Sequence, residues 1–140
     1  MYTINEGQFT HPPEWQDKTI NVLTLNHDDT PAFSLVITRD TIPKGMRFSD
    51  YALQEAIKAE RQLPEFEKIE ERSDERIDNQ PAHYLEYRWT STEGVLHQIV
   101  MMAIYHPQKI LIFTASAPNE ITDQQKKQVL DMLQSFRFHQ

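Results

Sequence analysis

The stretch that decides the fold is INVLTLNH at residues 20–27, followed after a short break by FSLVITR at residues 33–39. Both runs are rich in residues that favour β-strands, and side chains along a strand alternate between its two faces. The residues of one face of this strand pair are Leu23, Leu25, Phe33, Leu35 and Ile37. The opposite face carries Ile20, Val22 and Val36. A sheet that is apolar on both faces needs a cover on both.

Two further stretches have the periodicity of amphipathic helices. The first has an N-cap at Ser49, flanked by Phe48 and Leu53 as in a hydrophobic staple, and Pro64 ends it. The second, over residues 122–136, opens with a Thr-x-x-Gln capping box and carries one apolar stripe. Because two helices are enough for one face of the sheet, we expect the other face to be shielded by a partner, a second copy or a ligand.

The rest of the chain supplies further strands. The alternation in HYLEYRWT, residues 83–90, predicts a half-buried strand, and residues 96–105 and 110–117 are apolar enough to be central strands. Residues 65–78 are dense in charge, and propensity allows either a solvated helix or an edge strand there. Trp15 is expected in the core. The order predicts an α+β fold in which two main helices flank an antiparallel β-sheet, within a single domain of residues 1–140.

Composition excludes several classes of function. The chain has 14 basic and 21 acidic side chains, and its formal net charge of −7 disfavours nucleic acid and anionic lipid as partners. Cysteine is absent, which excludes thiol catalysis, disulfides and sulfur-ligated zinc. The start, MYTINEGQFTHPPEW, lacks a signal-peptide pattern, and no apolar run reaches the ~18 residues of a spanning helix. We expect a cytoplasmic protein that does not insert into a membrane.

Motifs for catalysis or cofactor binding are missing from the sequence. The six histidines have no metal-ligand spacing and are expected at the surface and in turns. The three glycines stand alone, so no phosphate-binding loop is indicated, and there is no GxSxG nucleophile motif. We therefore predict no enzyme activity, no catalytic residue, no metal site and no cofactor.

The strand LHQIVMMAIY, residues 96–105, bears on binding. Met101 and Met102 either fill the core, which we favour, or adapt to a variable apolar partner. Gln98 shares the parity of Leu96 and Val100, so its amide lies on a largely apolar face and needs a hydrogen-bonding partner. That partner is either a water or neighbouring backbone group, or a polar group of a bound apolar helix.

A series of short motifs runs along the chain in a characteristic order. In number and order these motifs resemble the Eag-type chaperones, small bacterial proteins of the DcrB-like, PsbP-like superfamily that accompany type VI secretion effectors. The resemblance covers nearly the whole chain, and its motifs are structural rather than catalytic. The motifs are Tyr2, Glu6-Gly7, Trp15-Gln16-Asp17, Ile20-Asn21, VITRD at residues 36–40, Phe48 with Tyr51, Gln62-Leu63-Pro64 followed by Phe66, and Tyr87-Arg88-Trp89.

The resemblance implies a PsbP-like sheet flanked by helices, a homodimer, and a concave sheet face open for binding. That face would hold the N-terminal transmembrane helices of a cognate effector, of PAAR or Rhs type, before loading and export. The aliphatic positions of the family's groove fall on Ile20, Val22 and Val36, the face left without a cover above. The resemblance also favours a strand over residues 65–78.

Two polar positions of the family's groove fall on Gln98 and Glu55. The second is often glutamine in the family, and a buried carboxylate there is costly unless it is protonated or paired.

Two other functions remain open at this point. A DcrB-like envelope accessory protein is disfavoured by the missing signal sequence and lipobox cysteine. A domain that binds a small apolar ligand without catalysis is disfavoured by the lack of convergent polar residues.

Overall fold

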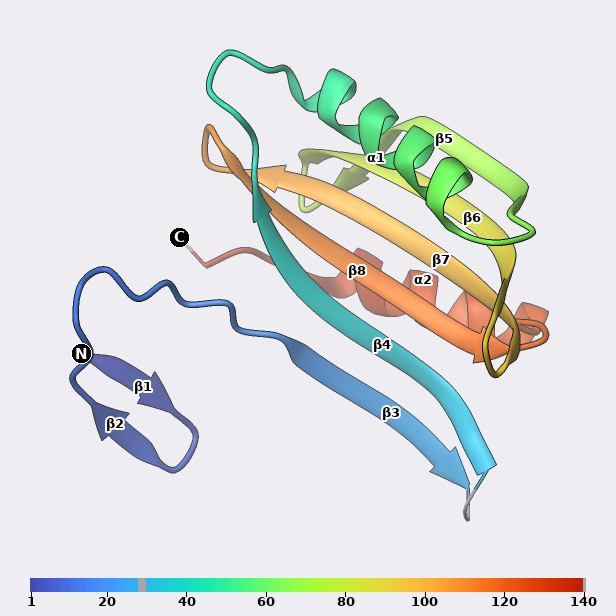
Figure 1. Cartoon of the computed structure of the whole chain (residues 1–140), viewed down its shortest axis with the longest axis horizontal. Helices are drawn as coiled ribbons and strands as arrows, with labels where there is room; N and C mark the ends of the chain where they lie inside the picture. Colours follow the sequence, from blue (N-terminus) through green and yellow to red (C-terminus); the bar gives the residue numbers. More distant parts are fainter. Residues whose placement is uncertain (28–29, 140) are drawn as a thin grey trace.

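The computed structural model describes the backbone of residues 1–27 and 30–139, with the side chains outside residues 26–32. Within these residues, six strands form one antiparallel sheet in the order β3-β4-β8-β7-β6-β5, and β1 and β2 form a separate hairpin (Figure 1). The strands are β1 (Tyr2–Ile4), β2 (Gly7–Phe9), β3 (Asn21–His27), β4 (Thr30–Thr41), β5 (Glu67–Ile77), β6 (Gln80–Ser91), β7 (Gly94–Tyr105) and β8 (Lys109–Pro118), and the helices are α1 (Phe48–Gln62) and α2 (Asp123–Ser135).

The two helices lie on opposite faces of the sheet (Figure 1). Helix α2 places Val129 and Leu133 in the main core, against apolar side chains from β4 to β8. Helix α1 places Tyr51 and Ala52 against Met102 and other side chains of the opposite face. The expectation that both helices cover one face is therefore wrong. What remains uncovered is part of the α1 face, beside the helix, rather than a whole face.

The predicted strands are present as strands, and the predicted α+β fold is confirmed. Residues 65–78 contain the edge strand β5, and the Met101 and Met102 side chains are buried, as core filling requires. The prediction for residues 83–90 is wrong in one respect: from Ala82 to Tyr87 strand β6 is buried on both faces. It lies inside the sheet with α1 above it and α2 below, so neither set of alternating side chains reaches solvent.

The start of helix α1 differs from the predicted one. Helix α1 begins at Phe48 with Arg47 at the N-cap position and no side-chain cap, so the predicted Ser49 cap is wrong. Phe48 packs against the α1-side core, which draws it into the first turn. Leu63 is extended ahead of Pro64, as expected for a residue that precedes proline. The capping box of Thr122 and Gln125 at the start of α2 is confirmed.

Trp15 lies outside the core, with 68% of its surface exposed, which corrects the prediction. Its backbone N–H donates to the carbonyl of Pro12, 3.1 Å away, in a turn beyond the β1–β2 hairpin. This N-terminal arm, residues 1–19, is held mainly by hydrogen bonds between its own residues. The Tyr2 hydroxyl donates to Asp17, for example, at 3.1 Å. The arm therefore stands beside the start of β3 (Figure 1).

Two histidines are buried, contrary to prediction, and each bonds to a glutamate: His83 to Glu71 and His97 to Glu86, both at 2.7 Å. The His27 side chain lies outside the described residues. His97 Nδ1 accepts from the backbone N–H of Ile121, so its Nε2–H donates to Glu86. This bond fastens the segment that leads into α2 to the sheet.

Glu86 also accepts hydrogen bonds from the Tyr84 hydroxyl (2.7 Å) and Lys126 Nζ (2.9 Å). Burial by itself raises the pKa of Glu86, but the hydrogen bonds from Tyr84, Lys126 and His97 outweigh it and hold the pKa below its ordinary value. The carboxylate is therefore charged at neutral pH and ties β6, β7 and α2 together.

We expect Glu86→Gln to lower the free energy of unfolding by roughly 2–3 kcal/mol at pH 7, because charged hydrogen bonds are lost from a buried site. The contribution of a carboxyl with a lowered pKa is present above its ordinary value of 4.5 and is lost as the pH falls through its folded-state pKa. Urea denaturation should therefore show the two proteins converging in acid. Glu93→Gln, at an exposed turn, is the control, and an equal gap at pH 3 and pH 7 would contradict the assignment.

Candidate functional site

The sheet surface beside α1 is organised in two rows that run across the strands. Both rows follow from the register of neighbouring strands and belong to the face that carries α1. The first, the hydroxyl row, is Thr24, Ser34, Ser116, Gln98 and Tyr87. The second, the valine row, is Val22, Val36, Thr114, Val100 and Leu85.

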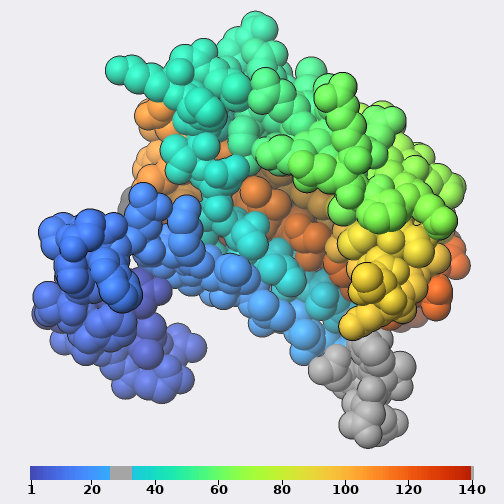
Figure 2. All heavy atoms as spheres, viewed as in Figure 1, coloured from blue at the N-terminus to red at the C-terminus, as the bar shows by residue number. Residues whose placement is uncertain are grey.

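Helix α1 covers only one end of each row. Leu85 and Tyr87 are buried beneath it, whereas Val22 at the far end is 56% exposed and Val36 is half-buried. We call the uncovered part the open sheet face, and Figure 2 shows it as a depression between α1 and the edge strand β3. It consists of Val22, Thr24, Ser34, Val36, Thr114 and Ser116.

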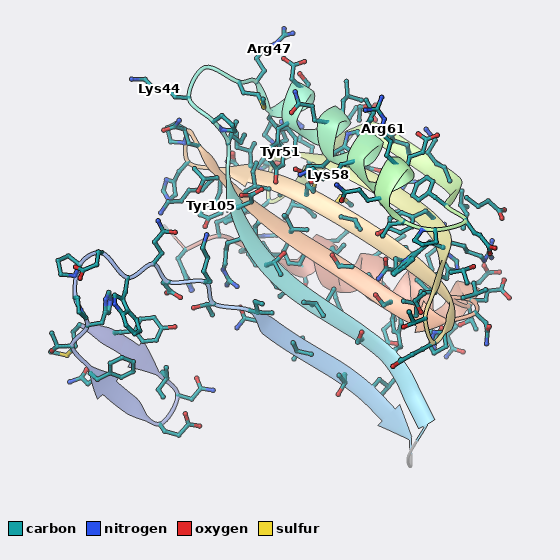
Figure 3. All side chains as sticks on the ribbon, viewed as in Figure 1. Lys44, Arg47, Tyr51, Lys58, Arg61 and Tyr105 are labelled. Atoms are coloured by element: carbon teal, nitrogen blue, oxygen red, sulfur yellow. The ribbon has the colours of Figure 1, made fainter. Side chains whose placement is uncertain are left out.

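One flank of α1 borders the open sheet face. The Tyr51 hydroxyl donates to Asp40 of β4 at 2.5 Å, which fastens the start of the helix to that strand. Burial, and then the Asp40 carboxylate, raise the pKa of Tyr51, so the phenol keeps its proton for this bond. Residues three or four positions apart share a helix flank, so Glu55 and Lys58 lie on the same side as Tyr51. Figure 3 labels Tyr51 and Lys58 on this helix.

Glu55 and Lys58 are 3.5 Å apart, between Oε1 and Nζ, and both are partly exposed. The glutamate that departs from the family's pattern is thus paired and solvated, and an uncompensated buried carboxylate is avoided.

Gln98 is held by three side chains. Its Oε1 accepts from the Tyr87 hydroxyl and from Trp89 Nε1, each at 2.9 Å, and its Nε2 donates to Ser116 Oγ at 2.8 Å. Burial raises the pKa of Tyr87 to about 12, so this donor stays protonated at physiological pH. The amide therefore finds its partners inside the protein, and one of its two N–H groups is left for a further bond.

Ile20 lies just before β3 and one residue before Asn21, the first residue that pairs with β4. It is exposed and lies at the mouth of a cleft of about 570 Å³ between the end of the N-terminal arm and the ends of β4 and β8. Arg39 crosses this region, with Nη1 donating to Asn21 Oδ1 at 2.6 Å and to the Thr19 carbonyl at 3.1 Å. The structure thus pairs Val22 with Val36, and Gln98 lies further along the same face, on β7. Glu55 lies on α1, and Ile20 lies apart from them, beside the end of the N-terminal arm.

Sequence reasoning missed the hydroxyl row. Its signal was present, because Thr24 and Ser34 have the parity of Val22 and Val36 in the same two strands. The pairing of Gln98 with Tyr87 and Trp89 could not be read from spacing, since it depends on the register of β6 against β7.

Comparison with known proteins assigns the family. The family model described as DcrB matches residues 6–135. The chain belongs to the DcrB family. It is 36% identical over 91 residues to a Pseudomonas aeruginosa protein named Effector EagT6, and the match spans 64% of this chain and 62% of that protein.

Solved structures share the fold. A Pseudomonas aeruginosa protein, PA94, described as a putative regulator of unknown function, matches with a TM-score of 0.81 and 26% identity, over 99% of this chain and 96% of that one. The PsbP of Synechocystis matches with a TM-score of 0.52 and 17% identity, over 83% and 79%. The second likeness concerns the fold alone. Together with the DcrB match and the identity to EagT6, these findings confirm the resemblance drawn from the sequence.

The part of the chain that the structure describes contains no helix long and apolar enough to cross a membrane. Among the same residues, no three His, Asp or Glu side chains come together as a metal site. The His97–Glu86 pair is buried beneath the start of α2, on the face opposite the open sheet face.

We expect Gln98→Leu to lower the free energy of unfolding by about 1–3 kcal/mol, because Tyr87 and Trp89 lose their shared acceptor in a half-buried site. Urea denaturation measures this difference, and Gln54→Leu on the outer side of α1 is the matched control. An unchanged midpoint for Gln98→Leu would show that water replaces the amide and that the network does not hold the face in shape.

Proposed function

We propose that this chain is a cytoplasmic chaperone, without catalytic activity, that binds and shields the N-terminal transmembrane helices of a type VI secretion effector of PAAR or Rhs type before export. The observation that carries the proposal is the open sheet face, where Val22 and Val36 form an apolar floor that none of the described residues covers. The DcrB family match and the identity to EagT6 support the same function.

The chemistry of the open sheet face suits an apolar helix. A transmembrane segment of ~20 residues left in water exposes apolar surface along its whole length, and each Å² covered contributes about 25 cal/mol. The valine row supplies that cover. The hydroxyl row beside it consists of short side chains, which allow a helix to approach closely and to place its own Ser, Thr or Gly residues against hydroxyl groups.

The same mixture keeps the unoccupied protein soluble. An uninterrupted apolar floor would associate without selectivity, whereas four of the six residues of the open sheet face carry hydroxyl groups that stay hydrated before the helix arrives: Thr24, Ser34, Thr114 and Ser116. The Glu55–Lys58 pair provides a polar rim above the floor. Such a surface holds a helix without a covalent or nucleotide-driven step, and a more apolar environment, such as a bilayer, is able to take the helix away.

The three groove residues and the two polar positions have distinct roles in this proposal. Val22 and Val36 contact the helix side chains, and Ile20 extends the apolar strip toward the N-terminal arm. Gln98 uses its remaining N–H to donate to a carbonyl or hydroxyl oxygen of the helix. Glu55 acts at the rim, as a solvated charge paired with Lys58, rather than as a neutral clamp.

Val22→Asp tests the proposal directly. It places a carboxylate on the apolar floor, and burying that charge under a helix should weaken binding by more than about 100-fold. The fold should survive because Val22 is exposed. Co-expression with the N-terminal segment of a PAAR or Rhs effector from the same bacterium, followed by co-purification, measures binding, and circular dichroism of the isolated variant measures folding.

Leu53→Asp is the matched control, since Leu53 is exposed to a similar degree on the β5-side flank of α1, away from the open sheet face. It should leave co-purification intact. A folded Val22→Asp variant that still solubilises the segment would rule out this groove, and a wild-type chain that binds no such segment would reject the chaperone function.

A further inference from the structure

The cleft beside the N-terminal arm differs in chemistry from the open sheet face. We call it the arm cleft, and its volume is about 570 Å³. Strand β3 pairs with β4 only as far as Ile37, so the outer edge of β4 from Thr38 to Thr41 has no neighbouring strand among the described residues. These four residues line one side of the cleft, and residues 17–20 at the end of the arm line another.

Three cationic side chains line the arm cleft: Lys18 of the arm, Arg39 of β4 and Lys109 of β8. The whole chain has 14 basic against 21 acidic side chains, so this cluster runs against the overall charge. Among the ion pairs of the described residues, none includes any of the three. Their charges are therefore available to a group that enters the cleft.

Arg39 is held in place by uncharged acceptors. Its Nη1 donates to Asn21 Oδ1 at 2.6 Å and to the Thr19 carbonyl at 3.1 Å. These bonds fix the direction of the guanidinium without cancelling its charge. Within the described residues its Nε and Nη2 donate no hydrogen bond, and these two groups form the fork that binds a carboxylate through two parallel bonds.

The two carboxylates that line the arm cleft are bound to uncharged donors. Asp17 accepts from the backbone N–H of Thr19 at 2.9 Å and from the Tyr2 hydroxyl at 3.1 Å. Asp40 accepts from the Tyr51 hydroxyl at 2.5 Å. Both acids thus hold parts of the fold together and neither forms an ion pair with the cations. The three positive charges exceed the two negative ones, which favours an anionic ligand.

The form of the arm cleft suits a peptide better than a small anion. Phosphate sites commonly use the backbone N–H groups of a helix N-terminus or a glycine-rich loop, and this cleft is lined by strands and by the arm. A nucleotide base would need a free aromatic ring to stack on. The one aromatic ring of the lining, Tyr105, already stacks on Phe138, with 5.2 Å between the ring centroids.

The arm cleft also continues the open sheet face. Thr38 follows Val36 on the same face of β4 and lines the cleft. A segment that leaves the open sheet face at this end therefore enters the cleft directly. The residues beside a transmembrane helix lie at the membrane surface or in water and include polar and charged side chains. The cations of the cleft select acidic residues among them.

We infer that the arm cleft binds the carboxylate side chains of a peptide segment, with Arg39 forming the bidentate contact and Lys18 and Lys109 adding positive charge. The segment is the acidic stretch of the effector that adjoins its apolar helix, an assignment that rests on the proposed function. The cleft would then fix the direction of the helix on the open sheet face, because the acidic end lies beside the arm.

A titration of the isotopically labelled full-length protein tests this site without an effector. The probe is the acetylated, amidated peptide Gly-Glu-Asp-Glu-Gly, and Gly-Gln-Asn-Gln-Gly is the uncharged control. The acidic peptide should shift the NMR signals of residues 38–41 and Lys109 in a saturable way, and the uncharged peptide should not. Arg39→Gln should weaken this binding about tenfold, because a bidentate charged contact is lost.

Lys109→Gln is the second variant, since the Lys109 side chain makes no hydrogen bond within the described residues and its loss leaves the arm in place. It should weaken the binding by a smaller factor, and it decides the matter if Arg39→Gln displaces the arm. Arg61→Gln is the matched control, because Arg61 is an exposed cation on α1, away from Tyr105 (Figure 3). It should bind the acidic peptide as the wild type does.

Equal binding of the two peptides would overturn the inference, as would wild-type affinity in both Arg39→Gln and Lys109→Gln. Inorganic phosphate is the third probe, and shifts of the same signals at equal or lower concentration would identify a site for free anions instead of a peptide. A failure of the chaperone function leaves these results unchanged. A wild-type chain that co-purifies with an effector segment but does not bind the acidic peptide overturns the arm-cleft site alone.

Discussion

The position of α1 on the sheet determines what this chain exposes. Six strands spaced at about 4.8 Å make a sheet about 24 Å across, whereas a helix with its side chains is about 10 Å wide. One helix therefore covers about half of a face. Tyr51 fastens the start of α1 to Asp40, and Ala52 and Ala56 bring the helix close to the sheet. With α1 held over β6 and β7, the β3 and β4 side of that face remains open.

The interior is arranged so that this open face keeps its shape while empty. Gln98 is bonded to Tyr87, Trp89 and Ser116, and so the floor beside α1 needs no ligand to satisfy its polar groups. On the other face, Glu86 and His97 fasten α2 through similar side-chain bonds. The side-chain hydrogen bonds of Gln98 and Glu86 thus hold neighbouring elements of the fold together. This arrangement of hydrogen bonds suits a binding protein, because the exposed surface keeps its shape before a ligand binds.

Periodicity was sufficient to predict the two helices and the central strands, and parity was sufficient to place Val22 with Val36. The failures concern choices that depend on distant parts of the chain. The side of the sheet taken by each helix, the burial of His83 and His97, and the exposure of Trp15 all depend on tertiary packing, which local patterns do not encode. Glu65 to Asp78 shows the same limit: its charges suit an edge strand only once the sheet order places it there.

Strand β3 presents different side chains to the two faces of the sheet. Because consecutive side chains point to opposite faces, Val22 and Thr24 are available to one surface while Leu23 and Leu25 are available to another. A charge at position 22 or 24 would lie on the open sheet face, and a charge at position 23 or 25 would lie on the face that carries α2. Strand β5, at the other edge of the sheet, carries charged side chains at all but three of its positions. Because charge protects an edge strand from pairing with another chain, the uncharged β3 edge is the less protected of the two.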